Sequence, residues 1–343
     1  MMPLQNTLYV TTQEAYLHKE GEAVVVKVGD ETRLRVPVHT LCGIVCFGHV
    51  LCSPALLGLC ADRSVSVSFL SERGRFLARI EGATSGNVLL RREQYRRADD
   101  PAASARLAQA FVSAKVFNAR IVLMRAARDH PDTQGRPEVE AAATRLGQVV
   151  DDLRQDRELD AIRGMEGDAA RVYFSVFDHL ITTQKEDFFF HERTRRPPMD
   201  SMNALLSFLY TILAHDCRSA LESVGLDPQV GFLHRDRPGR PSLALDLLEE
   251  FRPLLADRVA LSLVNLRQLQ SKGFRIHEAG AVFMDDETRK TVLATYQKRK
   301  REEIEHPFLG EKIAAGLLPY LQARLLSRHL RGDLDAYPPF LWK

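Results

Sequence analysis

Residues Gly82–Pro101, GATSGNVLLRREQYRRADDP, mark the point at which the chain changes character. The glycines Gly82 and Gly86, the charged run RREQYRRADD and the closing proline are typical of a junction between domains. Upstream, short alternating or β-branched runs predominate, and downstream the apolar residues recur at helical spacing. The chain is therefore predicted to be an α+β protein with an N-terminal β-rich domain, 1–90, and a C-terminal helical domain, 91–343.

The N-terminal domain contains short runs of the kind that form strands. They are TLYV, AVVVKV, TRLRVPV, GIVCFG, VSVSFL and RFLARI. One interruption, SPALLGLC, predicts a short helix with Ser53 as its N-cap and Pro54 at its first position. Acidic and basic residues balance in this domain, and no pattern in it indicates catalysis.

The C-terminal domain is predicted to be an all-helical bundle, because its apolar residues follow the helical period between Pro- and Gly-containing breaks. The expected helical pieces are 102–128, 138–165, 166–183, 200–223, 242–269, 285–305 and 309–331.

Composition gives no global sign of a nucleic-acid partner. The 47 basic and 45 acidic residues leave a formal charge of +2, so any phosphate-binding surface must be local. No uninterrupted apolar run approaches the roughly 18 to 20 residues that span a bilayer, so we expect a cytoplasmic protein with no membrane partner. The odd cysteine count of 5 suits a reducing compartment, and we expect buried free thiols rather than a zinc site.

A histidine and several acids form the first candidate site. His234 lies in GFLHRDRPGR, and the helix SLALDLLEEF follows, with Ser242 as a plausible N-cap. Asp246 and Glu249 are spaced i, i+3 on one face, and Glu250 follows directly. Carboxylates with an imidazole suit Mn²⁺ or Mg²⁺. The alternative is a solvated acidic face beside an ordinary histidine.

The second candidate is Glu166, between Gly164 and Gly167 in GMEGDAARVYF, at the expected head of an apolar helix. The small residues around it would let another element approach closely. Alternatively, the carboxylate complements the helix dipole, and Asp168 competes for the same role.

The sequence contains two basic clusters, and the first is a candidate for DNA binding. Arg193, Arg195 and Arg196 lie in HERTRRPPMD, before a helix that carries Asn203 among its apolar positions. Guanidinium groups on an extended segment suit bidentate contacts to phosphate. The second cluster, KRKR at 298–301, is followed by glutamates and is expected to be a solvated, salt-bridged helix face.

Several longer stretches occur in one order along the chain. They are NTLYVTTQEAYLHKEGEAVVV, GMEGDAARVYF, RTRRPPMDSMNALLSFLY, VGFLHRDRPGRPSLALDLLEEFRP and HPFLGEKIAAGLLPYLQARLLSRHLRGDLDAYPPFLWK. Together they resemble the CRISPR-associated spacer-integration endonuclease family, and the tail resembles that of its subtype I-C branch.

The resemblance implies a β-sheet dimerisation domain and a helical catalytic domain in which three residues hold Mg²⁺ or Mn²⁺. By position, these metal ligands and catalytic residues are Glu166, His234 and Glu249, and Asp246 corresponds to an accessory acid. Some members have aspartate where this chain has Glu249. The implied reaction inserts short foreign DNA fragments as new spacers, by attack of a 3′-hydroxyl on a phosphodiester of the CRISPR repeat.

The resemblance also implies partners. These are DNA, as short duplex fragments and the CRISPR repeat, a second copy of the chain in a homodimer, and a dimer of a small ferredoxin-like CRISPR-associated protein. In subtype I-C systems an iron–sulfur CRISPR-associated nuclease joins them.

Other interpretations stay open. A general metal-dependent nuclease acting on branched DNA would share the same metal site, and a helical DNA-binding scaffold would use the same acids structurally. A nucleotide-dependent enzyme is not supported, because neither GxxxxGK[ST] nor GxGxxG occurs.

Overall fold

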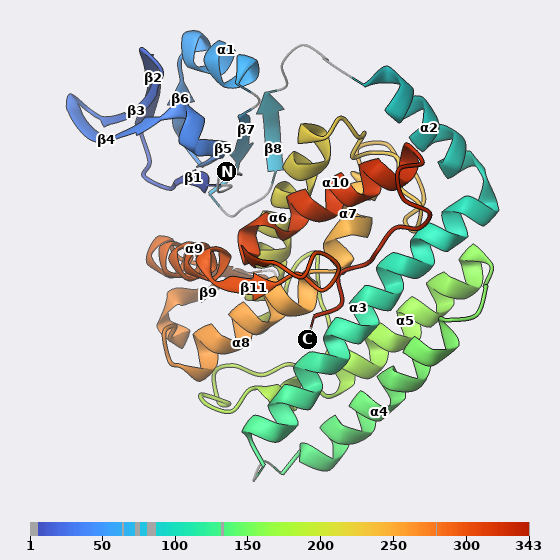
Figure 1. Ribbon diagram of the computed structural model, residues 1–343. Helices are drawn as coiled ribbons and strands as arrows, with labels where there is room; N and C mark the ends of the chain where they lie inside the picture. The colour runs from blue at the N-terminus through green and yellow to red at the C-terminus, as the bar shows by residue number, and fades with distance from the viewer. Residues whose placement is uncertain are drawn as a thin grey trace. The chain divides into compact units, whose positions relative to one another are not determined.

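The computed structural model describes residues 6–63, 65–72, 76–80, 87–131, 134–278 and 280–342. It divides the chain into two compact units, Met1–Gly86 and Asn87–Lys343. The first unit is built on β-sheets and the second is mainly helical, which confirms the predicted α+β class (Figure 1). Gly82 and Gly86, on which the predicted junction rests, lie outside the described residues.

The N-terminal unit contains two four-stranded sheets, with strand orders β1-β5-β7-β8 and β4-β3-β2-β6. Its elements are β1 (Asn6–Val10), β2 (Ala15–Glu20), β3 (Ala23–Val28), β4 (Glu31–Pro37), the 3-10 turn η1 (Val38–Thr40), β5 (Leu41–Phe47), β6 (Val50–Cys52), α1 (Pro54–Asp62), β7 (Ser66–Leu70) and β8 (Phe76–Ile80). All six predicted runs form strands. The sequence analysis missed β2 and β6, which pair with each other in parallel.

Helix α1 begins as predicted, since Ser53 accepts a hydrogen bond from the Leu56 N–H and Pro54 is the first helical residue. It packs on β2 and β7. The core of this unit gathers buried Leu17, Ile44 and Leu56 from β2, β5 and α1. β2 was overlooked because its second half, HKE, is polar and shows no hydrophobic alternation. The strand is instead stabilised by its pairing with β3 along its whole length.

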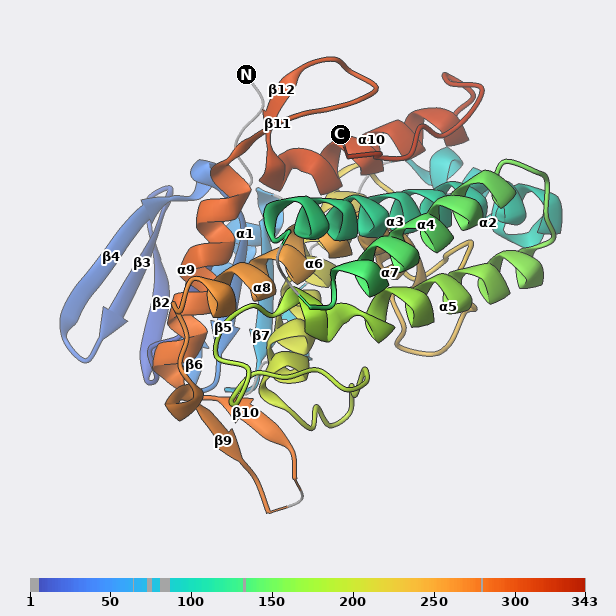
Figure 2. The ribbon, with the colours of Figure 1, turned by 90° about the horizontal axis from the view of Figure 1, so that it is seen from below.

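The second unit contains most of the helices. Its elements are α2 (Val88–Asp99), α3 (Pro101–Asp129), α4 (Arg136–Asp152), α5 (Leu159–Ser175), η2 (Phe177–Leu180), α6 (Ser201–Ser223), α7 (Ser242–Glu249), a π-helical turn (Arg252–Asp257), α8 (Arg258–Asn265), η4 (Ser271–Gly273), β9 (Phe274–Ile276), β10 (Val282–Met284), α9 (Asp286–Arg301), β11 (Glu303–Glu305), β12 (Lys312–Ala314), η5 (Ala315–Leu317) and α10 (Leu318–Leu330). Helices α3, α4 and α5 pack side by side, and α6 packs on α7 and α10 (Figure 2).

The prediction of an all-helical second domain is wrong in detail. Two short antiparallel ladders, β9–β10 and β11–β12, interrupt the helices. The helical period cannot reveal three-residue strands, because each is shorter than one turn of helical pattern. The prediction that the basic cluster 298–301 is a solvated helix face is also wrong at Lys300, which is buried with its ammonium 2.9 Å from the Asp216 carboxylate.

Helix α3 is long and apolar enough to cross a membrane by length and composition alone, and it is the one such helix among the described residues. We did not expect such a helix, because the sequence contains no uninterrupted apolar run of that length. However, 56% of its apolar window is buried within the protein. Because α3 packs against α4 and α5, its composition is that of a core helix.

The boundary between α4 and α5 corrects the prediction for Glu166. The sequence analysis placed a helix start at 166, but α5 begins at Leu159, so Glu166 lies within it. The actual break is the wholly exposed, charged run 154–158, which has no apolar face to bury. Of the small residues predicted to allow a close approach, Gly167, Ala169 and Ala170, Gly167 is open to solvent and does not serve it, whereas Ala169 is buried.

Candidate active site

The histidine loop is held against the start of α7 by a single carboxylate. Asp246, which is fully buried, accepts hydrogen bonds from the backbone N–H groups of Phe232 (2.6 Å), Leu233 (3.0 Å) and His234 (3.0 Å). Its Oδ1 also lies 2.6 Å from Nδ1 of the His234 ring. A carboxylate on one ring nitrogen fixes the orientation of an imidazole and leaves the other, Nε2, as the atom that can bind a ligand.

The approach of this loop to α7 requires a glycine. A Cβ at Gly231 would come within 2.8 Å of both Asp246 Oδ2 and Ser242. Ser242 is the first residue of α7 rather than its N-cap, and its hydroxyl donates instead to the Arg235 carbonyl at 3.2 Å. The predicted cap is therefore wrong, and the serine serves to close the loop.

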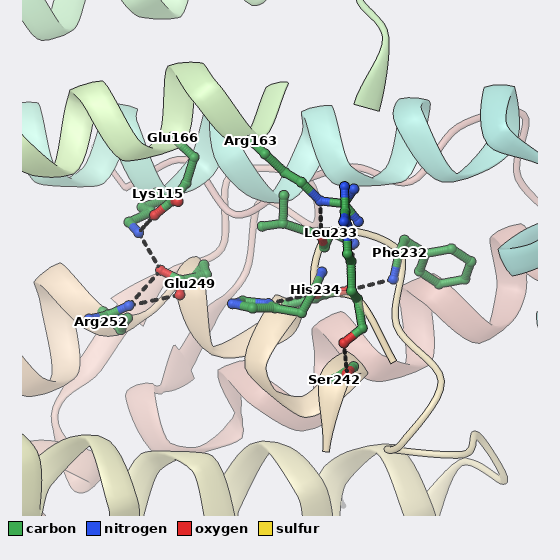
Figure 3. A network of polar contacts seen from close by, with 11 residues as sticks. Lys115, Arg163, Glu166, Phe232, Leu233, His234, Ser242, Glu249 and Arg252 are labelled. Carbon is green, nitrogen blue, oxygen red and sulfur yellow. Dashed lines mark hydrogen bonds and ion pairs between the residues drawn. The ribbon is translucent and has the colours of Figure 1, made fainter. Parts of the chain in front are cut away.

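Helix α5 holds the other side of the histidine loop. The Arg163 Nε donates to the Leu233 carbonyl at 2.7 Å, one residue before His234 (Figure 3). Arg163 precedes Glu166 by three residues, so both project from neighbouring positions on one face of α5. The same helix therefore presents a candidate ligand and positions the histidine.

Glu166 and Glu249 meet at one ammonium group. Lys115, from α3, forms a close ion pair with Glu166 and lies 2.8 Å from a Glu249 carboxylate oxygen (Figure 3). Arg252 lies 2.7 and 3.0 Å from the two oxygens of Glu249. We call these four residues the carboxylate–lysine cluster. It gathers side chains from α3, α5 and α7 and from the π-helical turn that follows α7, a rare conformation that is frequent at functional sites.

The electrostatics of Glu249 are set by its cationic neighbours. Burial of this side chain, which is 5% exposed, would raise its pKa. The positive charges of Arg252 and Lys115 outweigh the burial and hold the pKa of Glu249 well below its ordinary value. The carboxylate is therefore ionised at neutral pH. Glu166 is more accessible, with 28% of its side chain exposed.

Glu166, Glu249 and His234 are residue types that bind divalent cations. Within the part of the chain that the structure describes, no three acidic, histidine or cysteine side chains are gathered closely enough to hold a metal ion as they stand. However, Glu166 and Glu249 already share one cation, the Lys115 ammonium. The His234 ring points toward the side on which Glu249 and Arg252 lie (Figure 3). Two carboxylates and a carboxylate-bound imidazole are ligands suited to Mg²⁺ or Mn²⁺.

The two competing acids have other environments. Asp168 points to solvent and pairs with Arg171 at 3.0 Å, so it does not join Glu166 in the cluster. Glu250 was grouped with the acids near His234, and this is wrong. Its carboxylate accepts hydrogen bonds from the Phe340 N–H (2.7 Å), the Gln322 amide (3.0 Å) and the Tyr337 hydroxyl.

Glu250 belongs to a second polar group that holds the last residues of the chain. The Asn118 amide donates to the Glu250 carbonyl (2.7 Å) and the Phe340 carbonyl (2.9 Å), and its oxygen accepts from the Trp342 N–H (2.8 Å). We call Asn118, Glu250, Gln322, Tyr337 and Phe340 the tail-anchoring cluster. All five residues are buried.

The sequence analysis missed Lys115 and Arg252. Lys115 is far from the acids in sequence, and Arg252, although it follows Glu249 by three residues in EEFRP, was assigned no role. One signal was present: a lysine within the otherwise apolar stretch FVSAKVF of α3 must find a carboxylate or an exit to solvent.

The predicted DNA-contacting residues divide into two groups. Asn203 is fully buried, and its amide donates to the Glu192 carbonyl (2.7 Å) and accepts from the Thr194 N–H (3.1 Å). Arg193 donates to Asn203 Oδ1 at 2.7 Å, and burial lowers its pKa to about 10. Asn203 therefore has a structural role in place of the predicted DNA contact, because its buried side chain is not presented to a ligand. Arg193 is half-buried, and its contact with DNA stays a prediction.

Arg195 and Arg196 are exposed on the segment that Asn203 fixes to the start of α6. Their position agrees with a surface role, and their contact with phosphate stays a prediction.

Fold and site thus define an α+β protein whose helical unit gathers two carboxylates and a carboxylate-bound histidine. The family model for CRISPR associated protein Cas1 matches residues 8–298, and the chain belongs to this family. A relative from Chlorobaculum tepidum, CRISPR-associated endonuclease Cas1 1, is 55% identical over 338 residues, which cover 98% of each protein. A relative from Geobacter sulfurreducens, a CRISPR-associated exonuclease Cas4/endonuclease Cas1 fusion, is 36% identical over 343 residues, covering 97% of this chain and 60% of that protein.

Among solved structures, a casposase bound to integration product has the same fold. Its TM-score is 0.84 at 22% identity, covering 99% of this chain and 95% of that one. This likeness agrees with the β-sheet unit followed by a helical unit.

Proposed function

We propose that this chain is a divalent-metal-dependent DNA integrase and endonuclease of CRISPR adaptation, of the subtype I-C branch, acting in the cytoplasm. One observation carries the proposal: Glu166 and Glu249 contact the same ammonium group, that of Lys115, beside a histidine that Asp246 orients. Relatives named as CRISPR-associated endonucleases and a structural neighbour described with an integration product support the same chemistry.

The reaction exchanges one phosphodiester for another. The 3′-oxygen of a short DNA fragment forms a bond to phosphorus in the repeat, and the existing bond from that phosphorus to the 3′-oxygen of the repeat strand breaks. The attacking hydroxyl loses a proton and the leaving oxygen gains one. Because the number of phosphodiester bonds is unchanged, no nucleotide cofactor is required, which agrees with the missing phosphate-loop motifs. With water as the attacking group, the same site would cleave DNA.

Each residue has a distinct task in this proposal. Glu166, Glu249 and His234 would hold Mg²⁺ or Mn²⁺, which would lower the pKa of the attacking hydroxyl and stabilise charge on the phosphoryl oxygens. Asp246 holds the His234 ring in one orientation through Nδ1. Arg252 keeps Glu249 ionised and fixes its carboxylate by two contacts.

The proposed assembly extends to other chains. A homodimer would form through the N-terminal unit, where the exposed side chains of Tyr16 and Leu51 are direct neighbours on β2 and β6. We further propose a dimer of the small ferredoxin-like CRISPR-associated protein as partner. The relative in which an exonuclease is fused to the endonuclease supports the proposal of a partner nuclease.

A strand-transfer assay tests the proposal. The protein and its ferredoxin-like partner are mixed with a labelled short duplex and a repeat-bearing plasmid, in Mg²⁺, Mn²⁺ or EDTA. We expect the label to join the plasmid only with metal, and the product to be lost in His234→Ala and Glu166→Gln. Asp168→Asn is the matched control, because this acid lies two residues from Glu166 but faces solvent.

Two results would change the conclusion. Cleavage of branched DNA without joining, by a folded protein in the presence of metal, would favour the general nuclease. Joining that survives in His234→Ala and Glu166→Gln would show that the metal site is wrong.

A further inference from the structure

Lys115 has an unusual position for a lysine. It lies on the core helix α3 with 12% of its side chain exposed, and its ammonium contacts carboxylates from two other helices, Glu166 of α5 and Glu249 of α7. No other cation among the described ion pairs bridges α5 and α7. The lysine is therefore the link between the two acids that come from different parts of the sequence.

The bridge has a physical reason. Two ionised carboxylates repel each other strongly at short range, most of all when one is buried. Arg252 pairs with Glu249 and, among the described ion pairs, not with Glu166, so Lys115 is the cation that joins the two acids. Without a positive charge between them, we expect the α5 and α7 acids to separate.

A lysine ammonium and a divalent ion make different demands on these carboxylates. The ammonium offers three hydrogen-bond donors on a flexible four-carbon chain, whereas Mg²⁺ or Mn²⁺ takes carboxylate oxygens directly as ligands. Lys115 contacts Glu166 Oε1 and Glu249 Oε2, and carboxylate oxygens of these two residues would also serve as ligands of a shared ion. Ammonium and metal therefore compete for the same lone pairs.

We propose that Lys115 is the resident cation of this site: its ammonium holds Glu166 and Glu249 together before metal binding and is displaced when a divalent ion binds. This rests on the proposed function, since it takes Glu166 and Glu249 as ligands. Lys115 is a positioning residue in the metal-free protein, and the flexibility of its side chain allows it to swing away without movement of α3.

Metal affinity gives the first test. Binding of Mn²⁺ to the full chain is measured by the electron paramagnetic resonance signal of the free ion, for the parent and for Lys115→Met. Because the substitution removes the competitor, we expect Mn²⁺ to bind at least about tenfold more tightly. The control is Lys185→Met, which removes an exposed lysine paired with Asp178 at 3.0 Å and should leave the affinity unchanged.

Thermal unfolding of the same proteins gives a second measurement. In EDTA, Lys115→Met should unfold at a lower temperature than the parent, because the two carboxylates then repel each other. With Mn²⁺ present the difference should shrink, since the ion replaces the missing charge. An Mn²⁺ affinity that is unchanged or weaker, or a loss of stability that Mn²⁺ does not reduce, would overturn the displacement.

The parent protein allows a test without substitution. Acylation of lysines by an amine-reactive ester is followed by mass spectrometry, in EDTA and in Mg²⁺ or Mn²⁺. We expect labelling of Lys115 to rise severalfold with metal while that of Lys185 stays constant. Equal labelling of Lys115 in both conditions would contradict the proposal even if Lys115→Met does not fold.

The outcomes separate this inference from the function itself. If the parent binds no Mn²⁺, or if Glu166→Gln does not weaken the binding, the metal site of the proposed function fails. If the parent binds Mn²⁺ through Glu166 while Lys115→Met and the labelling show no effect, only the role of Lys115 fails.

Discussion

Glu249 and Glu250 are consecutive residues at the end of α7, yet they enter two different regions of the helical unit. Glu249 joins the carboxylate–lysine cluster, where positive charges hold its pKa below the ordinary value. Glu250 joins the tail-anchoring cluster, where it meets neutral donors only, and burial raises its pKa to about 7. Both are buried, so exposure does not distinguish them.

The difference shows what sets the charge of a buried acid. Burial penalises both carboxylates, and only the charge of the partners decides whether the ionised form persists. Helix α3 repeats the division, since Lys115 faces the first cluster and Asn118, three residues later, faces the second. Cationic partners keep Glu249 ionised, and the neutral donors around Glu250 hold a chain segment in place.

Exchanging each acid for its amide should give the largest contrast. Glu249→Gln should reduce strand transfer by more than about a hundredfold, because it removes a proposed ligand itself, and loss of outer partners alone costs about 10–100-fold. Glu250→Gln should retain most of the activity per folded molecule. The measurement is initial rate of joining at saturating Mg²⁺, normalised to folded protein. Similar losses in both variants would break the comparison.

Asp246→Asn tests the positioning of the histidine. Asparagine keeps one of the two acceptor oxygens, so it can still accept from the Phe232 and Leu233 N–H groups, but its NH2 then faces His234 in place of the charged oxygen. We expect Mn²⁺ affinity to fall by about 10–100-fold, as for other residues that orient metal ligands. Circular dichroism checks that the fold is retained. An unchanged affinity would show that Asp246 only closes the loop.

The pH dependence of stability should sharpen the contrast between the acids. Glu250 has a native pKa of about 7 against an ordinary value of 4.5, so between these values the native state keeps a proton that the unfolded state loses. This group therefore favours folding most below pH 4.5, and its contribution declines as pH rises to about 7. In Glu250→Gln that decline should be absent. Denaturant titrations of both proteins in EDTA across this range measure it, and parallel pH profiles would contradict the assignment.

Tyr337→Phe should have the smallest effect. The substitution removes one of the donors to Glu250 and leaves the Gln322 and Phe340 donors in place. We expect a loss of about 1 to 2 kcal/mol in the free energy of unfolding, with Mn²⁺ affinity unchanged. A change in Mn²⁺ affinity would show that the two clusters are coupled through α7.

Much of the fold followed from local pattern. The order of a β-rich unit and a helical unit, the six strand runs and the Ser53 cap were all predicted, because strand alternation, helical period and capping depend on near neighbours. The break at 154–158 was missed because glycines near 166 gave a stronger local signal. The short ladders were missed because their pairing is made between distant segments.

The sequence by itself determined which residue types could bind a metal and the order in which they occur. Only the tertiary structure decided that Lys115 lies between Glu166 and Glu249, that Asn203 is buried, and that Glu250 holds the tail. The physical reason is that successive residues of a helix point about 100° apart, so one step along α7 moves a carboxylate from one set of neighbours to another. Those neighbours come from α3, α5 and the chain end, and no local pattern specifies them.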